Sequence, residues 1–104
     1  AYDQRHFPEQ DRRGQLRLLV SPDGRDGSVA THQDALMYGA LLEAGESVVH
    51  AVQADRRAYV HVARGRIEVN GHALSAGDGA AIEDEAEISL RGIDGAEVLL
   101  FDLP

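Results

Sequence analysis

The chain has 104 residues, 43% hydrophobic and 27% charged, which is typical of a single globular domain rather than a disordered segment. Eighteen acidic residues against ten basic ones give a formal charge of −8, which argues against nucleic acid or an anionic membrane surface as a partner. All ten basic residues are arginine and there is no cysteine, so Schiff-base chemistry, disulfides and cysteine-ligated metals are excluded.

No apolar run approaches the length of a transmembrane helix, and no signal-peptide pattern opens the chain. We therefore expect a cytoplasmic protein. Residues 1–14 are polar and without periodicity, so we interpret them as an N-terminal arm with Phe7 as its anchor. The remaining residues, 15–104, are predicted to form one domain.

Short apolar stretches separated by turn signals follow the arm. Pro22-Asp23-Gly24 and Asn70-Gly71 are turn sequences, because proline presets φ and glycine or asparagine tolerates positive φ. Residues 33–44 have a composition that also suits a helix, but Gly39 interrupts the segment and a strand is preferred. The spacing of about 8–12 residues is typical of a β-sandwich or barrel. The predicted strands are 15–20, 29–33, 36–42, 47–52, 57–63, 66–69, 73–74, 80–82, 88–90 and 97–103.

Histidines and carboxylates are the candidates for chemistry. The five histidines contain no H-x-H and no H-E-x-x-H, and no serine lies in a nucleophile motif. Strand alternation places His50 on the same face as Val48, toward the core, whereas Tyr59 and His61 point outward. A single histidine on an apolar face is more often a hydrogen-bonded core residue than a metal ligand.

The stretch from Leu42 to Asp84 resembles a cupin core. It runs through Gly45, His50, the segments 58–65 and 67–71, Leu74 and the segment 77–82. Together with residues 2–7, 16–28, 41–45 and 99–103, nearly the whole chain resembles the C-terminal cupin domain of the pirin family, the bacterial quercetinase-like bicupins. SPDGRDGS (residues 21–28) is the most specific part. The resemblance implies an all-β fold, a cupin-type jelly roll or double-stranded β-helix in which a β-sandwich closes into a barrel.

The resemblance also implies where a metal would bind. A cupin site normally uses two histidines, a glutamate and a later histidine, and the matching positions here hold His50, Val52, Ala58 and Ile88. One ligand of four remains, so we predict no metal, no cofactor and no catalytic residue in this domain. The expected function is that of a degenerate, metal-free pirin-like cupin with a structural or protein-interaction role. It would accompany a metal-binding N-terminal cupin or be a stand-alone remnant.

The sequence leaves two alternatives open. One is a quercetin 2,3-dioxygenase-like enzyme with a rearranged ligand set, such as His50 with His32 or His61. The other is a cupin that binds a small molecule in the barrel interior, in a pocket lined by His50, Val52, Ala58 and Ile88. The expected partner is another cupin domain or a second copy of the chain, with Tyr59 and His61 as a candidate self-association face.

Overall fold

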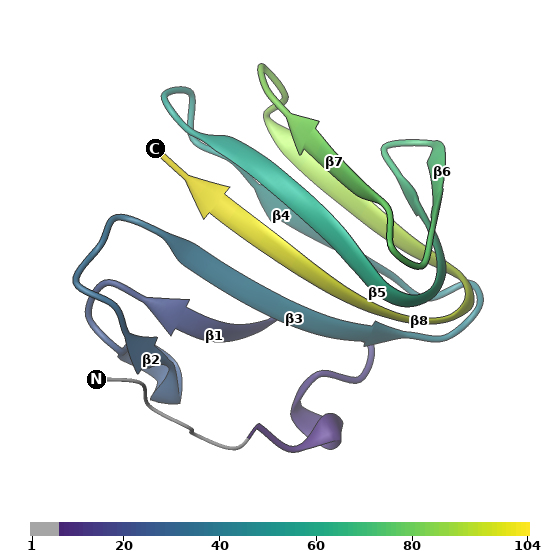
Figure 1. Cartoon of the computed structure of the whole chain (residues 1–104), viewed down its shortest axis with the longest axis horizontal. Helices are drawn as coiled ribbons and strands as arrows, with labels where there is room; N and C mark the ends of the chain where they lie inside the picture. The colour runs from purple at the N-terminus through teal and green to yellow at the C-terminus, as the bar shows by residue number, and fades with distance from the viewer. Residues whose placement is uncertain (1–6) are drawn as a thin grey trace.

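The computed structural model describes residues 7–104, and these are almost entirely β-strand (Figure 1). Two short 3₁₀ turns, η1 (Glu9–Asp11) and η2 (Arg25–Gly27), interrupt the strands. Within the described residues, no helix is long and apolar enough to cross a membrane. The strands are β1 (Arg17–Ser21), β2 (Val29–Ala30), β3 (Leu36–Leu42), β4 (Ser47–Ala51), β5 (Arg57–Val69), β6 (His72–Ser75), β7 (Gly79–Ile82) and β8 (Glu87–Leu103).

The all-β prediction is confirmed, including a strand rather than a helix across residues 36–42. The prediction of separate strands at 57–63 and 66–69 is wrong, because β5 continues through both. The same holds for 88–90 and 97–103, which are both parts of β8. The polar, glycine-containing segment in each strand does not end the strand. It lies where the pairing of β5 with β8 is irregular, with register shifts between Val62 and Ile67. Glycine marks bulges within strands as well as loops between them.

β5 and β8 are the two long central strands and pair with each other along their lengths (Figure 1). The second half of β8 pairs with β3, and the first half of β5 pairs with β7. The first half of β8 pairs instead with β4, and the second half of β5 with β6. One continuous eight-stranded sheet is therefore folded over on itself, and its two halves share the same two strands.

The core lies between the two halves of this folded sheet. Alternate residues of β5 and β8 point into it, so Ala58, Val60 and Val62 face the core as the strand alternation predicts. The buried apolar cluster is made of Ala40, Leu42, Val52, Ala58, Val60, Val62, Ile67, Val69, Ile88, Leu90, Ala96, Val98 and Leu100.

The described part of the N-terminal arm lies along the end of β3. The amide of Gly14 donates to the carbonyl of Leu41 at 2.8 Å, and the amide of Leu41 donates to the carbonyl of Arg12 at 2.7 Å. Phe7 lies under the guanidinium of Arg17, 5.2 Å from the ring centroid. Residues 1–6 of the predicted arm, His6 among them, lie outside the described residues.

Candidate functional site

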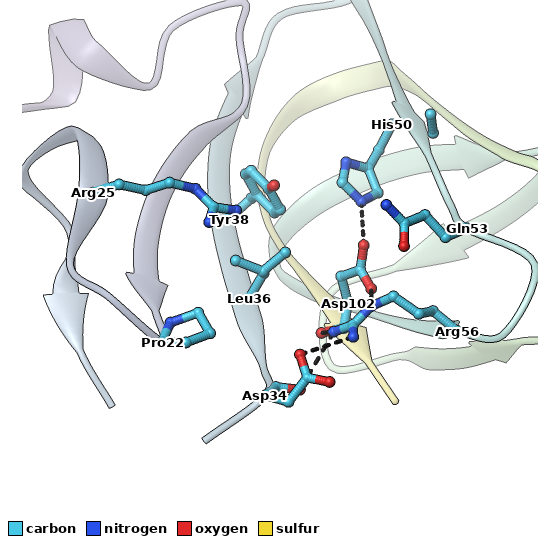
Figure 2. A pocket seen from close by; sticks show the side chains of 10 residues that line it. Pro22, Arg25, Asp34, Leu36, Tyr38, His50, Gln53, Arg56 and Asp102 are labelled. Atoms are coloured by element: carbon cyan, nitrogen blue, oxygen red, sulfur yellow. Dashed lines mark hydrogen bonds and ion pairs between the residues drawn. The ribbon is translucent and has the colours of Figure 1, made fainter. Parts of the chain in front are cut away.

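An open cavity of 320 Å³ lies where the loop after β1, strands β3 and β4, the loop after β4 and the end of β8 meet (Figure 2). Its walls combine charged, polar and apolar side chains, and several of these bond to one another. The lining residues are Pro22, Arg25, Asp34, Leu36, Tyr38, His50, Ala51, Gln53, Arg56 and Asp102.

The carboxylate of Asp102 is the centre of this site. Asp102 is 4% exposed and lies near the end of β8, two residues after the fully buried Leu100. A buried carboxylate is costly unless its charge is paired and its oxygens accept hydrogen bonds. Here one oxygen accepts a bond from Arg56 Nε at 2.5 Å, and the other lies 2.8 Å from His50 Nε2. Both carboxylate oxygens are therefore occupied by partners within the protein.

Arg56 connects Asp102 to the loop before β3. Its Nη1 donates to the Asp34 carboxylate at 2.8 Å, and its Nη2 donates to the main-chain carbonyl of Asp102 at 3.1 Å. The hydrogen bond to Asp102 is the main reason that the pKa of Arg56 is raised above its ordinary value, and Asp34 adds to the effect. The positive charge of Arg56 is thus shared between two carboxylates.

The rings of His50 and Tyr38 are in contact in the wall of the cavity, with centroids 4.8 Å apart and ring planes tilted by 54°. They come from β4 and β3, which pair with opposite halves of β8, so only the folding of the sheet brings them together. Burial raises the pKa of the Tyr38 phenol, and the negative charge of Asp102 raises it further. Tyr38 therefore stays a neutral hydrogen-bond donor well into the alkaline range.

The residues predicted as a pocket lining are not all in this cavity. His50 lines it, whereas Val52, Ala58 and Ile88 lie in the apolar core at 8%, 3% and 0% exposure. The exposed Tyr59 points outward from β5, with its ring 6.2 Å from that of Phe101. His61 is half-buried on the same strand, and His32 lies on an exposed loop.

Sequence reasoning missed Asp102, Arg56 and Tyr38 as parts of one site. A signal for Asp102 was present, because it shares strand parity with Val98 and Leu100 and so has to point toward the core. A carboxylate at such a position requires a buried partner. The partners lie 46 and 52 residues away, at Arg56 and His50, so the alternation of one strand does not identify them.

The side chains of this site do not suit a resident metal ion. In residues 7–104, no group of three or more histidines, cysteines, aspartates or glutamates is arranged to hold a metal. Tight binding of a transition metal requires about three or four protein ligands. His50 has only Asp102 beside it, and both oxygens of that carboxylate already have partners.

An eight-stranded sheet that folds over on itself around one apolar core is the jelly-roll fold of a cupin. An RmlC-like cupin protein from Desulfovibrio desulfuricans has the same fold, with a TM-score of 0.67 over the whole of this chain and 94% of that chain, at 15% sequence identity. More narrowly, the chain belongs to the family of quercetinase C-terminal cupin domains, whose sequence profile matches residues 18–103.

The relatives of the chain are bacterial proteins of about twice its length. Quercetin 2,3-dioxygenase of Escherichia coli (strain K12) is 44% identical over 103 residues, which are 99% of this chain and 43% of that protein. The crystal structure of YhhW from Escherichia coli superimposes with a TM-score of 0.92 at 42% identity, over all of this chain and 43% of that one. YhhW has also been solved in complex with nickel(II). The chain thus spans less than half the length of these relatives.

Proposed function

We propose that this chain is a metal-free pirin-like cupin domain with a structural and protein-interaction role, acting as the companion of a second cupin domain. One observation supports the proposal above all. The resemblance to cupins assigns four positions to metal ligands, and three of these carry Val52, Ala58 and Ile88, whose side chains are packed in the core. The fourth carries His50, which is hydrogen-bonded to Asp102.

The apolar replacements support a structural role because they fill the space that metal ligands require. A fully buried valine or isoleucine side chain stabilises the fold by about 1.5–3 kcal/mol. A histidine or glutamate at Ile88 or Ala58 would instead place an unpaired polar group in the core. The barrel interior of this chain is thus suited to stability rather than to coordination chemistry.

The outer face of the β3–β8–β5 layer is our candidate for the contact with the companion domain. Tyr59 is 39% exposed there beside Phe101, and it is one of two large apolar residues that are exposed in the described part of the chain. More than half the length of each of these relatives lies outside the part that matches this chain. The unmatched part is long enough to form a companion domain that packs on this face. Exposed aromatic side chains are common at such contacts.

Metal content tests the proposal. The chain is purified without chelator, dialysed against excess nickel(II) or iron(II), then dialysed free of unbound metal and analysed for both elements. We expect far less than one equivalent per chain, since about three ligands are needed for retention. His50→Gln is the control, and its metal content should equal that of the wild type. Retention of about one equivalent, lost in His50→Gln, would contradict the proposal.

A quercetin 2,3-dioxygenase activity is the second candidate, and the names of the relatives favour it. Its test is oxygen consumption with quercetin, measured for the same nickel- and iron-treated samples. Turnover that rises with metal content and disappears in His50→Gln would support an enzyme. Turnover at the level of free metal in buffer is the result that the structural role predicts.

A further inference from the structure

We propose that the cavity between Arg25, Tyr38 and His50 is a binding site for a small organic carboxylate with a flat apolar body. The proposal rests on the polar atoms that the buried network leaves unused, and it stands apart from the structural role of the domain.

The acidic groups of the cavity are already paired. Asp102 is bonded by Arg56 and His50, and Asp34 accepts from Arg56 Nη1 at 2.8 Å. Both carboxylates and the guanidinium of Arg56 therefore have partners within the protein. A ligand entering the cavity therefore meets no unpaired carboxylate on the side lined by Asp102.

The groups that remain are mostly hydrogen-bond donors. Among residues 7–104, the Tyr38 hydroxyl, the Gln53 amide and the second ring nitrogen of His50 have no hydrogen-bond partner. The guanidinium of Arg25 has only a loose ion pair of 3.7 Å with the exposed Asp23 in that part of the chain. Figure 2 shows the Arg25 side chain extended toward Tyr38, with His50 on the other side of Tyr38. A ligand rich in acceptors would satisfy them together.

Arg25 offers a place for an anion, although the chain as a whole carries a formal charge of −8. The lining is neutral in sum, because two arginines balance two aspartates, but Arg25 takes no part in the buried network and its guanidinium has only the ion pair with Asp23 among the described residues. One available guanidinium suits a single carboxylate, which it can bind through two parallel hydrogen bonds. A doubly charged phosphate would need more than this one available cation.

The remaining walls are apolar and determine the body of the ligand. Pro22 and Leu36 flank the cavity, and the Tyr38 ring closes one side (Figure 2). The volume of 320 Å³ lies at the lower end of the range of about 300–1,000 Å³ found for ligand pockets. This space suits a molecule with one small ring. An aromatic monocarboxylic acid matches the donors, the charge and the walls.

Benzoate is the probe that tests this site, and neutral benzamide is its uncharged counterpart. Each is titrated into the uniformly ¹⁵N-labelled chain while amide and imidazole resonances are followed by NMR. We expect saturable shifts from benzoate that are concentrated at residues 22–25, 34–38 and 50–56. Arg25→Gln should weaken benzoate binding by about ten-fold, because it removes a charge-assisted bond. Tyr38→Phe should weaken it by about three-fold.

Arg57→Gln is the matched control for Arg25→Gln. Both arginines are about half exposed, and each has an ion pair of 3.7 Å, Arg57 with Glu83 and Arg25 with Asp23, but Arg57 lies outside the cavity. Benzoate affinity in Arg57→Gln should equal that of the wild type. The proposal is overturned if benzoate shifts no cavity resonances at tens of millimolar, if benzamide binds equally well, or if both variants weaken binding alike. A well-dispersed spectrum for each variant shows that it is folded.

Discussion

At the scale of single residues, Asp102 holds together the strands and the loop that line the candidate site. It is a nearly buried carboxylate at the end of a strand whose neighbouring inward residues are Val98 and Leu100. Its two oxygens hold Arg56 and His50, so a single side chain joins the loop after β4 to β4 itself and to β8. Removing one partner of such a network leaves the others buried without compensation, which is where the energetic cost arises.

Asp102→Asn should lower the free energy of unfolding by about 2–3 kcal/mol, because Arg56 loses the charge that faces it. Glu68→Gln is the matched control: it also removes a carboxylate that pairs with an arginine, in this case Arg91 at 2.8 Å on the surface. A surface pair contributes about 0–1 kcal/mol. Urea denaturation followed by circular dichroism gives both values. Equal losses in the two variants would mean that the Asp102 network contributes no more than a surface pair.

At the scale of strands, the irregular segment of β5 has a steric requirement at Gly65. The residue has φ of +74°, and a Cβ atom there would lie 2.2 Å from the carbonyl oxygen of Asp94 and 2.4 Å from that of Gly95. The register of β5 against β8 shifts on both sides of this point. The close approach of two backbones, where the folded sheet changes direction, is therefore possible only without a side chain.

Gly65→Ala and Gly71→Ala separate the two causes of this requirement. Both glycines have positive φ, but a Cβ at Gly71 would meet nothing within 4 Å. Gly71→Ala should therefore lower the free energy of unfolding by about 1–2 kcal/mol, which is the cost of placing alanine in the left-handed backbone conformation. Gly65→Ala should lower the free energy of unfolding by at least about 2 kcal/mol more than Gly71→Ala does, since backbone atoms must also move. Unfolding midpoints in urea measure the difference. Similar losses in both variants would show that the approach of Asp94 is easily relieved.

At the scale of the whole molecule, the outer face of the β3–β8–β5 layer carries an exposed aromatic side chain. Tyr59 and Phe101 lie on it, and the relatives of the family are about twice as long as this chain. A face that contacts a companion domain in a longer protein is available to a second copy when the chain is alone. Self-association is therefore a readout of the proposed interaction role.

Sedimentation velocity should show a reversible increase in mean mass as the concentration of the chain rises. Tyr59→Asp should suppress the increase, because it places a charge in the contact. Val49→Asp is the control, since Val49 is 57% exposed on β4 and belongs to another part of the sheet. A monomer at every concentration, or the same loss of association in both variants, would show that the outer face is not the contact surface.

Local features of the fold could be predicted from the sequence, and long-range features only in part. Alternation of apolar residues and the turns at Pro22 and Asn70 located most strand segments, because these signals act within a few residues. The continuity of β5 and β8 was not predicted, because Gly65 and Gly92 read equally as loops and as bulges. His50 was placed correctly on the inward side of its strand. Its connection to Asp102 was not predicted, since 52 residues separate the two.

The way in which β5 and β8 run through both halves of the sheet also bears on how the chain unfolds. Their pairing joins residues 57–69 to residues 87–103, so it closes a loop that includes β6 and β7. Neither half can separate without breaking part of this shared ladder. The chain therefore has no boundary at which one layer could open as an independent unit, and its central strands should lose protection from hydrogen exchange only when the whole structure opens.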